Sequence, residues 1–350
     1  MTKITSATLE DGEVLVSIVL TTFNSERVLE KTLRGIIEQD FPLNRVELII
    51  VDGGSKDNTL KIIREFITHY ARKFYDINVI VHDKNYGVSK ARNDGLKESR
   101  GKYLLILDHD VYMEGNVLHK LYEFLSNSPS RIIGAMPLLV PVSNNLLNRW
   151  RVRVLEGRIT EYYAVADCIL LRRDVVELIG YYDETLGPPF TIFEEREYGA
   201  RIESKGFKIY MLGWIKAYHY CNVEDEDREQ KSNRKTFSRI LSALHTLINE
   251  KYLYGLRKWF KSMSLSQKIR WLTYLILALS FTPIATISII TKTPHPLITW
   301  LIPAAILYMD TLKQYWNYKV FHISLTYAFI AYMWRLIRAL GLVLSIKVNV

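Results

Sequence analysis

The 350-residue chain is poor in cysteine and begins without an apolar leader. Its two cysteines, Cys168 and Cys221, form neither a disulfide framework nor a CxxC pair of metal ligands. We therefore expect two reduced thiols in a reducing compartment, which excludes a small disulfide-stapled secreted domain. Residues 1–14 hold four charged side chains and no long apolar run. We therefore expect no signal peptide and a first part of the chain that stays in the cytoplasm.

Acidic residues are scarce in the last hundred positions. Between Lys251 and Val350 the chain has one acid, Asp310, against twelve lysines and arginines. This stretch therefore carries the whole of the +9 net charge. A basic excess often marks a nucleic-acid partner. Here the basic residues flank apolar segments, so we expect an anionic membrane surface and no nucleic acid.

Residues 1–235 alternate short apolar runs with segments of helical periodicity. This pattern predicts an α/β domain built on a mostly parallel sheet, with helices on both faces. The predicted strands are Val14–Leu20, Val46–Val51, Ile77–Val81, Tyr103–Leu107 and Ile132–Val140. The predicted helices are Ser25–Gln39, Asp57–Tyr70, Ser89–Ser99 and Val117–Leu125. Ligands of such sheets bind beyond the carboxyl ends of the strands, so those ends carry the candidate site.

The remaining residues follow a different pattern. Residues 236–270 are basic and aromatic with helical spacing, which predicts amphipathic helices at a membrane interface. Residues 271–350 predict a transmembrane region of two to three segments: Trp271–Ile290, Pro294–Met309 and Val320–Trp334. The basic flank predicts a multi-pass protein of the cell membrane whose first domain lies on the cytoplasmic side.

Polar side chains follow three of the predicted strands. Thr21 and Phe23 follow the first strand, and Asp52 follows the second with two glycines behind it. Asp52 has the chemistry to accept a hydrogen bond from a base or ribose, and Phe23 to pack against that base. The polar and glycine residues after these two strands are equally compatible with turns that have a purely structural role. Arg92 lies near the start of a helix that follows Gly87, where helix dipole and guanidinium favour a diphosphate.

The fourth strand ends in Asp108-His109-Asp110. Two carboxylates two positions apart at the mouth of a parallel sheet make a site of hard oxygen ligands. Magnesium or manganese suits such a site better than zinc does. The sequence therefore predicts a divalent cation that bridges to a diphosphate.

Together these segments closely resemble glycosyltransferase family 2, the inverting enzymes of the GT-A fold, in a membrane-attached form. The resemblance covers Val14 to about Arg239. It rests on TTFN, VDGGSKDNT, NYGVSKARNDGL, GKYLLILDHD, LLRRDVVELIGYYDE and EEREYGARIESKGFKIY. It implies transfer of a sugar from a UDP- or GDP-linked donor, with a divalent cation, to a hydroxyl of a lipid-linked glycan or glycolipid.

The resemblance also assigns roles to individual residues. Asp110 is the implied direct metal ligand, Asp108 lies near the ribose or a metal-bound water, and His219 is a late metal or diphosphate ligand. Inverting transfer to a hydroxyl needs a carboxylate that takes its proton. Glu195 occupies the position of that base, with Glu194 as the alternative. The family usually has an aspartate there, and the extra methylene moves the carboxylate by about 1.5 Å.

Two other functions compete with this hypothesis. A polyprenyl (dolichyl) phosphate sugar synthase uses an acceptor that is already ionised, so it needs no base. The pair Glu194-Glu195 favours a hydroxyl acceptor, whereas Arg335 and Arg338 favour the rival because they are suited to a lipid phosphate. A catalytically silent, membrane-anchored protein that only binds nucleotide sugars would have lost the acidic motif or the base, and this chain retains both.

Overall fold

The computed structural model describes residues 2–5, 13–142, 146–187, 193–220, 250–291, 295–315 and 332. The chain divides into two compact units. The first unit comprises Met1–Ser143 and Gly157–Asp227, and the second comprises Asn144–Glu156 and Arg228–Val350. The candidate site lies entirely in the first unit.

A mixed ten-stranded sheet forms the centre of the first unit, in the order β1-β4-β3-β2-β5-β9-β7-β10-β6, with β8 paired to β10. The predicted parallel strands are present at its core. They are β2 (Val16–Thr22), β3 (Val46–Asp52), β4 (Asp76–Val81), β5 (Tyr103–Asp108) and β7 (Ile132–Pro141). Every residue of β2 and β3 is buried, as the continuous apolar runs predict for strands covered on both faces.

Several strands of the sheet have no counterpart in the sequence prediction. They are β1 (Thr2–Thr5), β6 (Val111–Met113), β8 (Ile159–Tyr162), β9 (Cys168–Arg172) and β10 (Lys208–His219). Strand β9 runs antiparallel between β5 and β7, and β10 lies parallel to β7. This second half of the sheet brings distant parts of the sequence beside the predicted strand ends.

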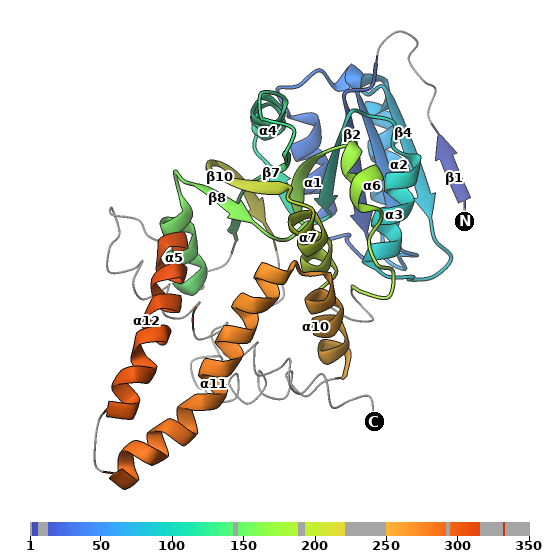
Figure 1. The fold of residues 1–350 in the computed structure, drawn as a ribbon. Helices are drawn as coiled ribbons and strands as arrows, with labels where there is room; N and C mark the ends of the chain where they lie inside the picture. Colours follow the sequence, from blue (N-terminus) through green and yellow to red (C-terminus); the bar gives the residue numbers. More distant parts are fainter. Residues whose placement is uncertain are drawn as a thin grey trace. The chain divides into compact units, whose positions relative to one another are not determined.

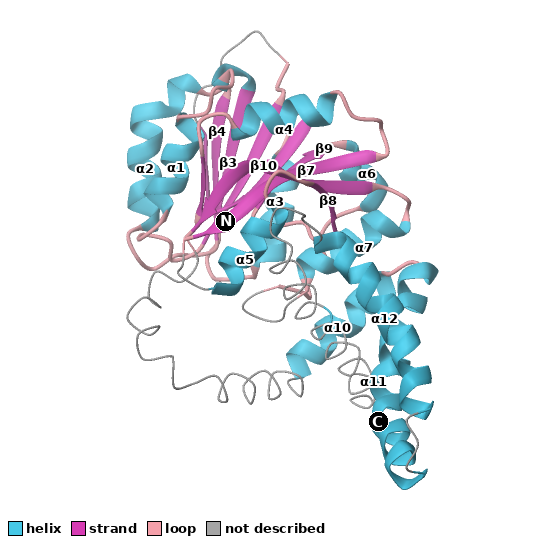
Figure 2. Ribbon diagram, turned by 90° about the vertical axis from the view of Figure 1, so that its left-hand side faces the viewer, coloured by secondary structure: helices cyan, strands magenta, loops and turns pink. Residues whose placement is uncertain are grey.

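Helices flank the sheet on both faces (Figure 2). They are α1 (Leu29–Ile37), α2 (Thr59–Tyr70), α3 (Val88–Glu98), α4 (Val117–Ser126), α6 (Asp174–Ile179) and α7 (Glu194–Ser204). The helix α3 packs closely on β2 because Gly95 leaves no side chain between them; a Cβ there would overlap Val19. The predicted α/β class is therefore confirmed.

The second unit is helical in its described part, with α5 (Leu146–Leu155), α10 (Glu250–Ser262), α11 (Leu265–Thr291) and α12 (His295–Tyr315), as Figure 1 shows. Helices α11 and α12 pack together through Tyr274, whose hydroxyl lies 3.1 Å from that of Thr311. The indole of Trp300 donates a hydrogen bond of 3.1 Å to the carbonyl of Leu277.

Among the helices of the described residues, none combines the length and the hydropathy needed to cross a bilayer. The predicted transmembrane region is therefore not supported for Trp271–Ile290 or Pro294–Met309. Apart from Tyr332, the third predicted segment lies outside the described residues, as do Arg335 and Arg338.

Candidate functional site

The strand register places the predicted polar residues along one edge of the sheet. Thr21 of β2 lies beside Asp108 at the end of β5, and Thr22 lies beside Asp52 at the end of β3. Phe23, just beyond β2, is 40% exposed, and its ring lies next to Gly53. The sequence prediction that these strand ends meet is confirmed, and Phe23 offers an accessible ring for stacking at that edge.

Asp52 is fully buried, and its carboxylate is occupied by neighbouring groups. One oxygen accepts hydrogen bonds from the amides of Gly54 and Ser55, and the other accepts from the hydroxyls of Thr22 and Ser55. These four bonds match the acceptor capacity of a carboxylate. In this geometry Asp52 orders the glycine loop beside Phe23, and it presents no free oxygen to a nucleoside.

Arg92 lies in the interior, beside the acidic motif. Its side chain is 2% exposed. Its Nη2 lies 3.0 Å from both carboxylate oxygens of Asp108, and its Nη1 lies 3.6 Å from Glu194. Burial disfavours the charge, but Asp108, then Tyr182 and Glu194, outweigh it and raise the pKa of Arg92. Arg92 therefore connects the acidic motif to Glu194, one of the two glutamates predicted as the catalytic base.

Asp110 pairs with His219 at the end of β10. Oδ2 of Asp110 lies 3.1 Å from Nε2 of His219, and the carbonyl of Asp110 accepts a hydrogen bond from the amide of Tyr220. Burial lowers the pKa of His219, but the hydrogen bond and charge of Asp110 outweigh burial and raise it to about 9. Burial likewise raises the pKa of Asp110, and His219 more than reverses that shift. At neutral pH the two form an ion pair.

The predicted set of three metal ligands is not assembled. Within the described ranges, no three His, Cys, Asp or Glu side chains converge closely enough to hold a metal ion. Asp108 is turned to Arg92 instead. Asp110 and His219 lie side by side and offer an oxygen and a nitrogen donor, so these are the two residues that would hold a magnesium or manganese ion here.

The two candidate bases, at the start of α7, differ in their surroundings. Glu194 is 8% exposed and lies against Arg92. Burial raises the pKa of its carboxyl, against the opposing effect of Arg92. Glu195 is half-buried, and its carbonyl accepts a hydrogen bond of 3.1 Å from the amide of Val165. Glu195 is thus the more accessible carboxylate, as its predicted role requires, and Glu194 is a partner of Arg92.

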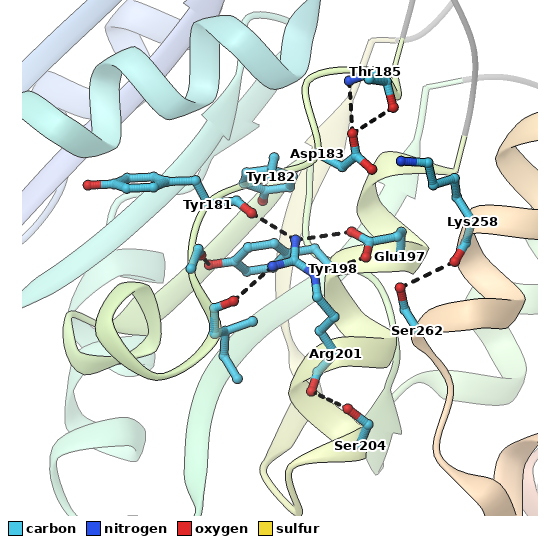
Figure 3. A network of polar contacts seen from close by, with 12 residues as sticks. Tyr181, Tyr182, Asp183, Thr185, Glu197, Tyr198, Arg201, Ser204, Lys258 and Ser262 are labelled. Carbon is cyan, nitrogen blue, oxygen red and sulfur yellow. Dashed lines mark hydrogen bonds and ion pairs between the residues drawn. The ribbon is translucent and has the colours of Figure 1, made fainter.

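A network of polar and aromatic contacts around Arg201 and Tyr198, called the clasp below, holds α7 in place (Figure 3). Arg201 binds both carboxylate oxygens of Glu197 at 2.9 and 3.0 Å, and its Nη2 donates to the carbonyl of Tyr181. The rings of Tyr198 and Tyr182 stack with their centroids 4.3 Å apart. Tyr182 also contacts Arg92 through the face of its ring, 5.5 Å from the guanidinium carbon. The clasp therefore links the base-bearing helix to the buried arginine.

Sequence reasoning missed Asp167. This residue directly precedes β9, and its carbonyl accepts a hydrogen bond of 2.8 Å from the amide of Asp108. Burial, followed by the charges of Asp108 and Glu195, raises the pKa of its carboxyl to about 7. A lone acid before the apolar run CILL gave no signal, because only the antiparallel insertion of β9 brings it to the site.

Three non-glycine residues of the described chain have left-handed backbone, and all three adjoin the site. They are Asn24 (φ 48°), Asp167 (φ 62°) and Phe193 (φ 79°). Asn24 follows Phe23, and Phe193 precedes Glu194. Such conformations cost free energy and concentrate where function requires a fixed geometry.

The mixed sheet, the helices around it and the acidic motif at the strand ends define a GT-A type α/β fold. Residues 17–180 match the sequence profile of glycosyl transferase family 2. They therefore form a glycosyltransferase family 2 domain, as the sequence motifs predict.

Individual relatives agree with this assignment. A Methanococcus voltae protein named dolichyl N-acetyl-alpha-D-glucosaminyl phosphate 3-beta-D-2,3-diacetamido-2,3-dideoxy-beta-D-glucuronosyltransferase is 24% identical over 216 residues, 59% of this chain and 66% of that one. The chain spans about half the length of the curated relatives that it matches.

Two solved structures share the fold. Staphylococcus aureus TarS in complex with UDP has a TM-score of 0.52 at 18% identity, over 71% of this chain and 65% of that one. The mannosyltransferase PcManGT of Pyrobaculum calidifontis, in complex with GDP-Man and Mn²⁺, has a TM-score of 0.50 at 16% identity, over 94% of this chain and 89% of that one.

Proposed function

We propose that the chain is an inverting glycosyltransferase that moves a sugar from a UDP- or GDP-linked donor to a hydroxyl of a lipid-linked glycan or glycolipid. The observation that carries this proposal is that Arg92 contacts both Asp108 of the acidic motif and Glu194, the neighbour of Glu195, in a family 2 domain. The donor diphosphate belongs at the acidic motif and the acceptor at Glu195. The reacting carbon then lies between them.

On the donor side, Phe23 stacks on the base beside the loop that Asp52 orders. The pair of Asp110 and His219 provides the two side chains that would hold magnesium or manganese. Such a cation supplies positive charge against the diphosphate as it leaves. Binding the cation requires His219 to give up its proton, so binding and proton release are coupled.

On the acceptor side, Glu195 takes the proton of the attacking hydroxyl. The new bond forms at the anomeric carbon on the face opposite the diphosphate, and the bond from that carbon to the diphosphate oxygen breaks. General-base catalysis of this kind contributes about 10²–10⁴-fold. Arg92 and the clasp around Arg201 fix α7 and so hold the Glu195 carboxylate in position. In this role neither arginine needs to touch the acceptor sugar.

We further propose that the enzyme works at a membrane surface, with the family 2 domain on the cytoplasmic side. The outer face of α11 bears an apolar stripe of exposed residues. They are Leu265, Ile269, Leu272, Ile276 and Leu279, each 44–74% exposed. They recur every three or four positions, so they share one helical face. Lys268 and Arg270 lie on the same helix, and basic residues beside an apolar face suit an anionic leaflet.

The proposal also specifies the chemical class of the acceptor. The Methanococcus voltae relative is named for a dolichyl-phosphate-linked sugar, which favours transfer to a hydroxyl of a sugar that is already lipid-linked. An enzyme tethered beside the bilayer meets such an acceptor by diffusion in two dimensions. A bare polyprenyl phosphate would make Glu195 unnecessary, because that acceptor needs no base.

The test is a screen of UDP- and GDP-sugars with purified full-length protein and Mn²⁺, first by binding and then by transfer to lipid-linked sugars in vesicles. We expect saturable binding of one donor and transfer that Glu195→Gln reduces at least 100-fold, while the exposed Glu30→Gln leaves transfer unchanged. Transfer to polyprenyl phosphate that survives Glu195→Gln would support the synthase instead. Absence of binding to every nucleotide sugar would refute the proposed function.

Membrane association is tested separately by flotation with vesicles of phosphatidylcholine alone or with phosphatidylserine. The double variant Ile269→Gln/Ile276→Gln should lose binding to the anionic vesicles. Leu178→Gln, which changes an exposed apolar residue of the first unit, should retain it. Equal flotation of both variants would contradict the role of the stripe.

A further inference from the structure

The carboxylate of Asp167 is not used by the mechanism described above. The side chain is half-buried, and its carboxylate has no hydrogen-bond partner among the side chains of the described ranges. It lies near two other carboxylates, those of Asp108 and Glu195. A half-buried carboxylate near like charges is unfavourable unless a ligand supplies donors to it.

The backbone at Asp167 is also strained. Its φ of 62° is left-handed, which among L-residues only asparagine and aspartate adopt with some ease. The hydrogen bond from the amide of Asp108 to the carbonyl of Asp167 holds this conformation against the end of β5. At Asp167 a carboxylate near two like charges therefore coincides with a left-handed backbone that the hydrogen bond to Asp108 maintains.

The position of Asp167 identifies the ligand. Its carbonyl accepts a hydrogen bond from the amide of Asp108, and two positions earlier the amide of Val165 donates to the carbonyl of Glu195. The backbone of Asp167 therefore lies between the acidic motif and the candidate base, next to the space that separates them. In a glycosyltransferase this space holds the ring of the transferred sugar, whose hydroxyl groups are neutral hydrogen-bond donors.

We propose that Asp167 accepts hydrogen bonds from hydroxyl groups of the donor sugar and so determines which sugar is transferred. This inference rests on the proposed function. A carboxylate in this position discriminates by geometry, because a hydroxyl inverted at one carbon points away from it. Loss of a hydrogen bond to a buried charged group is a strong penalty, which gives the residue its selectivity.

The test compares two ligands that differ only in the sugar. Calorimetry on full-length protein with Mn²⁺ measures the Kd of UDP and of UDP-N-acetylglucosamine, and of GDP and GDP-mannose. The affinities of the wild-type protein show whether the uridine or the guanosine pair of ligands is the one to compare in the variants. Asp167→Asn keeps the size of the side chain and tolerates the left-handed backbone. Asp167→Gly removes both the strain and the side chain, and the exposed Asp174→Asn is the charge control.

We expect Asp167→Asn and Asp167→Gly to weaken the nucleotide sugar by about 10- to 100-fold while leaving the nucleoside diphosphate unchanged. Asp174→Asn should change neither ligand. Equal weakening of both ligands would mean a structural role and overturn the inference. Unchanged sugar binding, with or without a loss of kcat, would overturn it as well. If the wild-type protein binds no nucleotide sugar, the proposed function fails first, which distinguishes the two failures.

Discussion

Arg92 and Asp108 meet in the interior, with Nη2 of the arginine 3.0 Å from each oxygen of the aspartate. This contact turns the first acid of the motif away from a metal ion and toward the protein. The second acid, Asp110, pairs with His219 instead. Because Arg92 also lies beside Glu194, one buried cation fixes both the acidic motif and the start of α7.

Removing this cation should destabilise the fold. Arg92→Met leaves Asp108 and Glu194 buried without their partner, and breaking a buried pair costs about 3–5 kcal/mol. Urea denaturation of the variant should show this loss. The exposed Arg64→Met should show almost none, and adding Asp108→Asn to Arg92→Met should recover part of the loss. Strict additivity of the two changes would contradict the pairing.

Substitutions of the two glutamates at the start of α7 should have different effects on catalysis and on stability. Glu195→Gln should lower kcat about 10²–10⁴-fold with donor affinity and stability retained, because it removes proton acceptance without changing volume. Glu194→Gln should lower the melting temperature, because the charge beside Arg92 is lost. Single-turnover rates and thermal melts measure both effects. A dead Glu194→Gln and an active Glu195→Gln would reverse the assignment.

Asp110→Asn should weaken Mn²⁺ binding by removing one negative charge from the proposed metal site. His219→Gln should do the same by removing the nitrogen ligand. Electron paramagnetic resonance of free Mn²⁺ measures the affinity directly, without any assay of transfer. Asp83→Asn changes a fully exposed carboxylate and serves as control. Wild-type affinity in both site variants would place the cation elsewhere.

Stability near the site should depend on pH through Asp167. Its folded pKa of about 7 lies above the ordinary 3.8, so between these values the folded state binds the extra proton. Stability therefore falls as the pH rises from 4 to 7. Asp167→Asn lacks this loss and should gain about 4 kcal/mol relative to wild type at pH 8, and little at pH 4. Melting curves at both values measure the difference; an equal difference at pH 4 and 8 would contradict it.

The strand ends were predictable because the physical signal is local. Thr21, Asp52 and Asp108 each follow a continuous apolar run, and parallel strands bring such ends to one edge. The fate of Arg92 was not predictable, because helical spacing cannot distinguish an arginine facing a phosphate from one buried against Asp108. Its predicted role toward a diphosphate stays a prediction.

The second half of the site depends even more on tertiary structure. Asp167 has no local pattern around it, and β9 reaches β5 only by an antiparallel insertion. The pairing of His219 with Asp110 spans 109 positions. The sequence suggested His219, and Glu195 ahead of Glu194, by family resemblance alone; the difference in burial between the two glutamates appears only in the structure.

The late position of β9, α7 and β10 in the chain has a consequence during synthesis. Strands β2 to β5 are close in sequence and pair with one another, so they form by local contacts. Asp167, Glu195 and His219 lie 59 or more positions after Asp108 in the sequence. A chain that has left the ribosome only as far as residue 150 therefore has the acidic motif but neither the base nor the histidine. The site closes only when β10 has emerged and joined the sheet.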